Sequence, residues 1–293
     1  RQWVIENDWL EAIVALPDQL FYNTGISTYI WIVTNRKEEH RRGKIQLIDA
    51  TGYFVKMRKS LGNKRHEIGD GLNGKPDHIA EITRLYGEFK EGEHVKIFDN
   101  SDFGYRRITV ERPLKLNFAV TAERLTRVRE TSQFINLASR RDTRRGESGI
   151  RPEPTAHQGD HEDRPYIAEG KRVQEAILQA LQGLASQSVV KDRNRFTALM
   201  KQAFKQARLA VPAALFDAVL MALSERDETA DVCRDSEGHS EPDPELRDYE
   251  NVPLKENIAD YMAREVLPHV PDAWVDDSKT RTGYEINFNR YFY

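Results

Sequence analysis

The sequence predicts an α/β fold followed by a mainly α-helical C-terminal region, on three observations. Residues 10–16 form an apolar run, broken only by Glu11, that is typical of a strand buried on both faces of a mainly parallel sheet. Residues 28–34 and 44–50 are rich in β-branched and apolar side chains, as strands are. Beyond residue 173, apolar side chains recur at the spacing of helices.

The first elements follow from local signals. Residues 1–8 resemble the end of a helix, and Pro17 ends the first strand because proline donates no ladder hydrogen bond. The polar connection between strands 28–34 and 44–50 is short. We therefore expect those two strands to pair antiparallel.

The middle of the chain alternates between irregular and regular segments. Residues 52–65 are basic and are expected to be irregular. Asp77 is a candidate N-cap for a helix with apolar side chains on one face. Polar and apolar residues alternate from Tyr105 to Glu111, which predicts a strand.

Composition shifts after residue 123, where Arg, Asp, Glu, Gly and Pro dominate, and residues 140–165 are interpreted as an exposed loop or linker. The expected domains are 1–122, 123–172 and 173–293. Helices are expected at 173–184, 195–207, 213–223 and 254–266, before an extended aromatic tail at 284–293.

Composition excludes several classes of function. The net charge of −3 argues against a generic polyanion binder, so any nucleic-acid contact must come from local basic patches. One cysteine, Cys233, excludes an internal disulfide and a cysteine zinc site, and the histidines show no metal-ligand spacing. There is no apolar run of membrane-spanning length, no serine nucleophile elbow and no phosphate-binding Walker loop. We expect a cytoplasmic protein without a metal or a membrane partner.

A polar-aromatic loop follows the first strand and contains Phe21, Tyr22, Asn23, Thr24 and Gly25. Enzymes that modify a DNA base flip it out and stack it on aromatic or apolar side chains. Ligands in such sheets lie at the carboxyl ends of strands, where this loop is expected. Spacing alone favours an ordinary connection with its aromatic rings in the core.

Basic residues cluster at several places. The best candidate for DNA phosphate contact contains Lys56, Arg58, Lys59, Lys64 and Arg65, without an acid until Glu67. A solvated surface is the alternative explanation. Weaker clusters are Arg36, Lys37, Arg41 and Arg42; Arg106 and Arg107; and Arg140 to Arg145.

Residues 69–74 formally fit the pattern G-x-G-x-x-G. A dinucleotide loop of this kind follows a buried strand and opens a helix. The preceding residues, 63–68, are polar and basic instead. We therefore interpret residues 69–74 as a flexible loop rather than as a nucleotide site.

Residues 10–35, 96–114, 244–274 and 283–293 resemble the modification (M) subunit of type I restriction-modification systems, a DNA adenine-N6 methyltransferase. The resemblance implies the C-terminal edge of a Rossmann-like methyltransferase sheet, with residues 21–25 in the target-base pocket. It also implies S-adenosylmethionine as cofactor, double-stranded DNA as substrate, and specificity and restriction subunits as partners.

The family's Gly-rich cofactor loop and Asn-Pro-Pro-aromatic motif are not found in these residues, in which no two prolines are adjacent. We therefore expect a C-terminal portion of such a subunit, with no catalytic residue of its own and inactive alone. The alternative is a non-enzymatic module that docks to subunits or to DNA.

Overall fold

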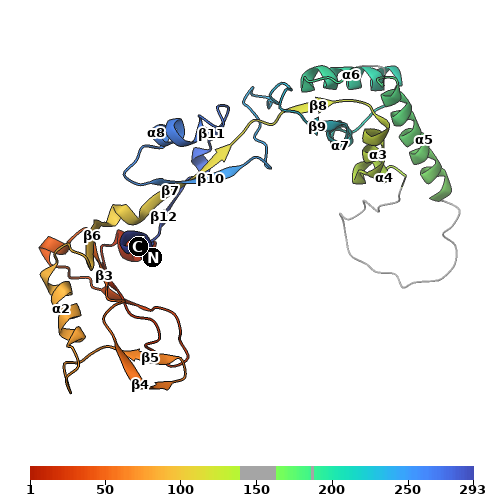
Figure 1. Ribbon diagram of the computed structural model, residues 1–293. Helices are drawn as coiled ribbons and strands as arrows, with labels where there is room; N and C mark the ends of the chain where they lie inside the picture. The colour runs from red at the N-terminus through yellow and green to blue at the C-terminus, as the bar shows by residue number, and fades with distance from the viewer. Residues whose placement is uncertain (139–162, 186–187) are drawn as a thin grey trace, which may run out of the picture. The chain divides into compact units, whose positions relative to one another are not determined.

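The computed structural model describes residues 1–138, 163–185 and 188–293, with side chains in helix α5 described from residue 169 onward (Figure 1). Most of the predicted linker at 140–165, and the basic cluster Arg140 to Arg145, lie outside these residues. The chain forms two compact units. Unit 1 contains residues 1–110 and 248–293, and unit 2 contains residues 111–247. The predicted division into 1–122, 123–172 and 173–293 stays a prediction.

The first sheet of unit 1 has the strand order β2-β1-β3-β6. Its strands are β1 (Leu10–Ala15), β2 (Tyr29–Val33), β3 (Lys44–Asp49) and β6 (Val95–Asp99). β1 pairs parallel with β3 and antiparallel with β2, and β6 pairs antiparallel with β3. These strands confirm the α/β prediction.

The expected antiparallel pairing of segments 28–34 and 44–50 is wrong, because β1 lies between β2 and β3. Strands two positions apart are separated by about 10 Å. The connection at 35–43, which contains the 3₁₀ helix η1 (Glu39–Arg41), is long enough to span that distance. The strand that is apolar on both faces takes the central position.

Helices cover both faces of this sheet. On one face Ile13, Ile45 and Leu47 belong to a core with Ile5 of α1 (Gln2–Glu6) and Phe288 of α9 (Phe288–Phe292). On the other face the sheet packs against α2 (His78–Glu88). The Asp77 carboxylate accepts a hydrogen bond from the backbone N–H of Ala80, as its N-cap role predicts.

The tail at 284–293 is not extended throughout as predicted, since α9 occupies half of it. Phe288 and Phe292 stack with ring centroids 4.9 Å apart, one helical turn from each other. Phe288 is buried against the first sheet, which selects the helix over an extended tail.

Glu11 is 7% exposed inside the central strand, where the pairing of β1 with β2 is irregular. Its carboxylate lies 3.6 Å from the guanidinium of Arg41, which is 5% exposed, and accepts a hydrogen bond from the Tyr86 hydroxyl. Burial, together with this hydrogen bond, raises the pKa of Tyr86 to about 12. The one acid of the apolar run is therefore paired rather than solvated.

A hairpin, not an irregular segment, occupies much of residues 52–65. β4 (Val55–Leu61) pairs antiparallel with β5 (Lys64–Glu67). Gly62 has φ +59° in the turn, and a glycine at the first central position is typical of tight hairpin turns. Basic side chains at successive positions hid the alternation that normally reveals a strand.

The second sheet of unit 1 is built around β7 (Gly104–Glu111), which confirms the strand predicted at 105–111. β7 pairs with β10 (Asp248–Pro253) on one side and with β11 (Trp274–Val275) and β12 (Arg281–Tyr284) on the other. The 3₁₀ helices η2 (Asn100–Phe103) and η4 (Asp277–Lys279) precede β7 and β12.

The helix predicted at 254–266 begins later, at α8 (Ile258–Tyr261), and continues as a π-helical turn, η3 (Met262–Val266). The Asn257 side chain accepts hydrogen bonds from the first backbone N–H groups of α8. β10 occupies residues up to Pro253, so the helix starts only after the turn that follows it.

Unit 2 has its own core, which contains Phe118, Ile177, Leu181, Met200 and Leu223. Its helices are α3 (Ala122–Glu130), α4 (Ser132–Ile135), α5 (Asp163–Gln182), α6 (Arg193–Gln206) and α7 (Ala213–Ala222), and its strands β8 (Leu116–Phe118) and β9 (Ser224–Arg226) pair antiparallel. The predicted helices at 173–184, 195–207 and 213–223 are confirmed as α5, α6 and α7. Over the described residues, no helix is long and apolar enough to cross a membrane.

Candidate nucleic-acid interface

The predicted base-pocket loop follows β1 at its carboxyl end, where the neighbouring β3 runs parallel. Leu20 is buried and anchors the loop to the core beside α2. Phe21 and Tyr22, which come next, are 50% and 66% exposed. Spacing alone favoured rings packed into the core, and the structure places both at the surface.

The β4–β5 hairpin lies directly against this loop. The backbone N–H groups of Arg65 and His66 both donate to the carbonyl oxygen of Gln19, at 3.0 and 3.2 Å. The Nδ1 atom of His66 lies 3.0 Å from the carbonyl oxygen of Asp18 and 3.1 Å from its carboxylate. The His66 ring also contacts the Phe54 ring, with centroids 3.9 Å apart. Two groups of residues singled out separately in the sequence are thereby brought together.

The tip of the hairpin contacts the exposed aromatic part of the loop. A Cβ atom at Gly62 would lie 2.9 Å from Cε2 of Tyr22 and 3.1 Å from Oδ1 of Asn23. Asn23 itself has φ +58°, a conformation that asparagine tolerates better than most residues. By contrast, a Cβ atom at Gly25 would meet nothing within 4 Å. Loop and hairpin therefore form one surface, with open space beside Gly25.

Five basic side chains of the hairpin have no carboxylate partner among the described residues. Lys56, Arg58, Lys59 and Arg65 are exposed and Lys64 is partly exposed. In the part of the chain that the structure describes, none of these five forms an ion pair, whereas neighbouring Lys75 lies 2.7 Å from the Glu67 carboxylate. Cations without carboxylate partners are available to phosphate groups.

Three residues of the weaker basic clusters have structural partners. The Nζ of Lys37 lies 2.6 Å from the Asp8 carboxylate, and Arg41 is buried beside Glu11. Arg106 donates to the carbonyl oxygen of Glu256. Arg107 projects from the opposite face of β7 and is exposed.

The glycine-rich residues 69–74 form a compact turn before α2. The backbone N–H groups of His78 and Ile79, at the start of that helix, both donate to the carbonyl oxygen of Gly69. The Asp77 carboxylate accepts a hydrogen bond from the backbone N–H of Ala80. These donors of the helix N-terminus are thus used internally, which argues against a phosphate cradle here.

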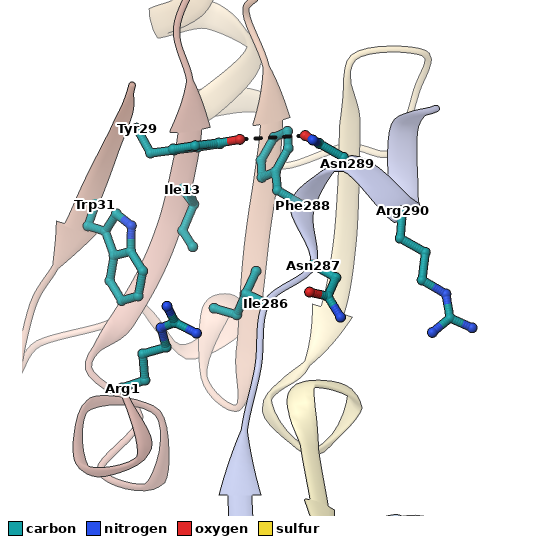
Figure 2. Close-up of a pocket in the computed structure, with 9 residues that line it drawn as sticks. All are labelled: Arg1, Ile13, Tyr29, Trp31, Ile286, Asn287, Phe288, Asn289 and Arg290. Atoms are coloured by element: carbon teal, nitrogen blue, oxygen red, sulfur yellow. Dashed lines mark hydrogen bonds between the residues drawn. The ribbon is translucent and has the colours of Figure 1, made fainter. Parts of the chain in front are cut away.

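Sequence reasoning missed a cavity of about 430 Å³ beside the edge of the first sheet (Figure 2). Tyr29 and Trp31 of β2 lie on one side of it, and the segment 286–290 lies on the other. The Tyr29 hydroxyl donates to Oδ1 of Asn289 at 3.5 Å. Aromatic side chains at alternate positions of β2 were a signal for one exposed face, but the return of the C-terminal segment was not visible in the sequence.

The described residues contain no group of three or more His, Cys, Asp or Glu side chains placed to hold a metal ion. Cys233 is a buried free thiol in unit 2, and burial raises its pKa. The candidate interface therefore offers aromatic stacking, polar contacts and positive charge rather than nucleophilic or metal chemistry.

Comparisons with known proteins found one family match and several similar proteins. Residues 1–103 match the family described as N-6 DNA Methylase. Three curated relatives are methylase subunits of type I restriction enzymes of Methanocaldococcus jannaschii. The MjaVIII subunit is 33% identical over 91 residues, which is 31% of this chain and 14% of the relative. The MjaVII subunit is 41% identical over 93 residues, 32% of this chain and 15% of the relative.

The MjaIX subunit is 25% identical over 130 residues, 44% of this chain and 21% of the relative, so the alignments span only a small part of each relative's length. The predicted resemblance is confirmed: residues 1–103 match the N-6 DNA methylase family, and the chain is similar to the methylase subunits of type I restriction enzymes.

Proposed function

We propose that this chain is part of a DNA adenine-N6 methyltransferase, the modification subunit of a type I restriction-modification system. Loop 17–28 and the β4–β5 hairpin form one wall of the pocket that receives the target adenine. The observation that carries this proposal is the docking of the basic hairpin on the loop, through the Gln19 carbonyl oxygen and the Tyr22 ring.

The two parts of this wall have different tasks. Phe21 or Tyr22 stacks on the flipped base, and Asn23 and Thr24 offer polar groups to its edge. The open space beside Gly25 leaves room for the base. The hairpin cations Lys56, Arg58, Lys59, Lys64 and Arg65 bind phosphates that flank the flipped nucleotide.

The edge of the first sheet fits a larger methyltransferase domain. Among the described strands, β2 pairs with β1 alone, and its Tyr29, Ile30, Trp31 and Val33 side chains are exposed. We propose that further strands of a Rossmann-like sheet adjoin this edge in the assembled enzyme. Unpaired strand edges with apolar side chains are normally covered.

S-adenosylmethionine supplies the methyl group in the proposed reaction. Neither a Gly-rich loop after a buried strand nor an Asn-Pro-Pro-aromatic motif occurs in this sequence, so we assign no residue here to the cofactor. We propose that the chain alone does not methylate DNA, and that specificity and restriction subunits are its partners in the assembled enzyme.

Binding of duplexes with one displaced base tests the pocket. Fluorescence anisotropy compares a duplex containing a single unpaired adenine with the same duplex carrying an abasic site there. We expect the chain to prefer the unpaired adenine. The double variant F21A/Y22A removes the preference, about fivefold or more, while leaving affinity for the abasic duplex unchanged.

Neutralising the hairpin is the complementary change. A variant with Lys56, Arg58, Lys59, Lys64 and Arg65 replaced by glutamine weakens binding of both duplexes and keeps their ratio. Equal affinity of the unaltered chain for both duplexes would refute the pocket assignment. Calorimetry with S-adenosylmethionine tests the inactivity of the chain, because tight binding would reveal a cofactor site within these residues.

A further inference from the structure

The second sheet of unit 1 has a buried face and a charged face. Ile108 and Val110 of β7 and Val252 of β10 belong to a core with Met262 and Val266. Alternate residues of the same strands point the other way. Arg107, Tyr249 and Arg281 on that side are all exposed.

Two arginines are direct neighbours on this face. The register places Arg281 of β12 opposite Arg107 of β7. Like charges directly opposite each other across an antiparallel pair are destabilising. In the described chain neither arginine forms an ion pair with a carboxylate. A bound anion would remove this repulsion.

The arginines line a cavity of about 470 Å³ together with Thr109, Tyr249 and Lys279. The lining contains three cations and no acid. Lys279 is compensated outside the lining, since its Nζ lies 2.7 Å from the Asp276 carboxylate.

An exposed ring completes the site. The guanidinium of Arg107 lies over the Tyr249 ring, 4.7 Å from its centroid, and Tyr249 is 50% exposed. Positive charge next to an exposed aromatic face is the pattern of nucleic-acid contacts, because it serves a phosphate and an adjacent sugar or base. An acidic peptide would use the charges but would not need the ring.

We propose that Arg107, Tyr249 and Arg281 form a second nucleic-acid contact, which shares no residue with loop 17–28 or the β4–β5 hairpin. Arg107 and Arg281 bind one backbone phosphate, and Tyr249 packs against the neighbouring sugar or unstacked base. The choice of DNA as the nucleic acid rests on the proposed function; the anion site itself does not.

The test measures anisotropy of the 293-residue chain with a labelled duplex and with the corresponding single strand at several salt concentrations. R107Q/R281Q is expected to weaken binding about tenfold and, because one phosphate contact is lost, to lower the slope of log affinity against log salt by about 1. K90Q is the matched control, because Lys90 is an exposed lysine of unit 1 outside both surfaces. Y249A weakens single-strand binding by about fivefold or more, whereas Y249F does not.

Thermal unfolding distinguishes a loss of DNA binding from a loss of folding in the variant. Without DNA, R107Q/R281Q should melt at or above the temperature of the unaltered chain, since it loses a like-charge pair. DNA should raise the melting temperature of the unaltered chain by more than that of the variant.

Two results would overturn the proposal. One is an affinity and salt slope of R107Q/R281Q equal to those of K90Q. The other is displacement of the labelled DNA by poly-L-glutamate as effectively as by unlabelled DNA of equal charge, together with unchanged single-strand binding by Y249A. That result would indicate a site for an acidic peptide. If the hairpin variant alone loses DNA, the second contact fails and the proposed function stands. If only R107Q/R281Q loses DNA binding, the second contact stands and the proposed function of the hairpin fails.

Discussion

Gly62 places the basic hairpin against loop 17–28, so G62A should disturb both. The native φ of +59° costs a residue with a Cβ atom about 1–2 kcal/mol. The new Cβ would also lie 2.9 Å from Cε2 of Tyr22. Because Tyr22 is 66% exposed, its ring can turn away at little cost. The expected penalty is therefore about 1–2 kcal/mol, with Tyr22 displaced.

Hydrogen–deuterium exchange measures the penalty where it arises. Amides of β4 and β5 should exchange about 5 to 30 times faster in G62A, as 1–2 kcal/mol implies. Preference for the unpaired adenine should fall as well, because the Tyr22 ring is displaced from its position against the hairpin turn.

G25A is the matched control. Gly25 lies in the same loop, has no positive φ, and its added Cβ would meet nothing within 4 Å. We expect its stability to change by less than about 0.5 kcal/mol. If G62A and G25A exchange at the same rates and keep the same adenine preference, the contact between hairpin and loop is not as described.

Three further predictions concern stability. R41M leaves Glu11 buried without its cation and should lower the free energy of unfolding in urea by about 3–5 kcal/mol; a loss below about 1 kcal/mol would contradict the buried pair. Burial opposes ionisation of Asp8, but hydrogen bonds from Lys37, Gly43 and Asn100 outweigh it and lower the Asp8 pKa. The stabilisation from ionised Asp8 is therefore present above the unfolded-state pKa of about 3.9 and is lost as pH falls through the lower pKa of the folded state. The difference in free energy of unfolding between the unaltered chain and D8N should be constant above about pH 5 and should shrink below about pH 4. M200A should cost about 2–5 kcal/mol because Met200 is fully buried in unit 2, whereas M221A, at a half-exposed methionine of the next helix, should change the melting temperature little.

Local patterns predicted the first strands and the longer helices of this fold and failed on the partners of those elements. The apolar run at 10–16 predicted a central strand because a strand buried on both faces has apolar side chains at consecutive positions. Which strands flank it depends on a crossover, and the connection at 35–43 has no feature that separates a hairpin from a crossover. Glu11 looked like a defect in the run because its partner, Arg41, comes from another element.

The candidate site shows the same division. Residues 21–25 were identified from their residue types and from the resemblance, and the cations from Lys56 to Arg65 from their basic clustering. Their proximity depends on backbone groups, the N–H of Arg65 and the carbonyl oxygen of Gln19, and every residue type carries those. Residue identities therefore gave no signal for the contact that joins the two parts.

The chain passes from unit 1 to unit 2 at the end of β7 and returns at the start of β10, and these two strands are hydrogen-bonded to each other. Val110, at the end of β7, is paired in register with Asp248, at the start of β10. Directly beyond this pair, the Arg247 guanidinium lies 2.8 Å from the Glu111 carboxylate. The two ends of a 111–247 excursion are thus fixed side by side. Lengthening, exchange or removal of residues 111–247 therefore needs only a new turn between β7 and β10, and leaves the strand pairing within unit 1 in place.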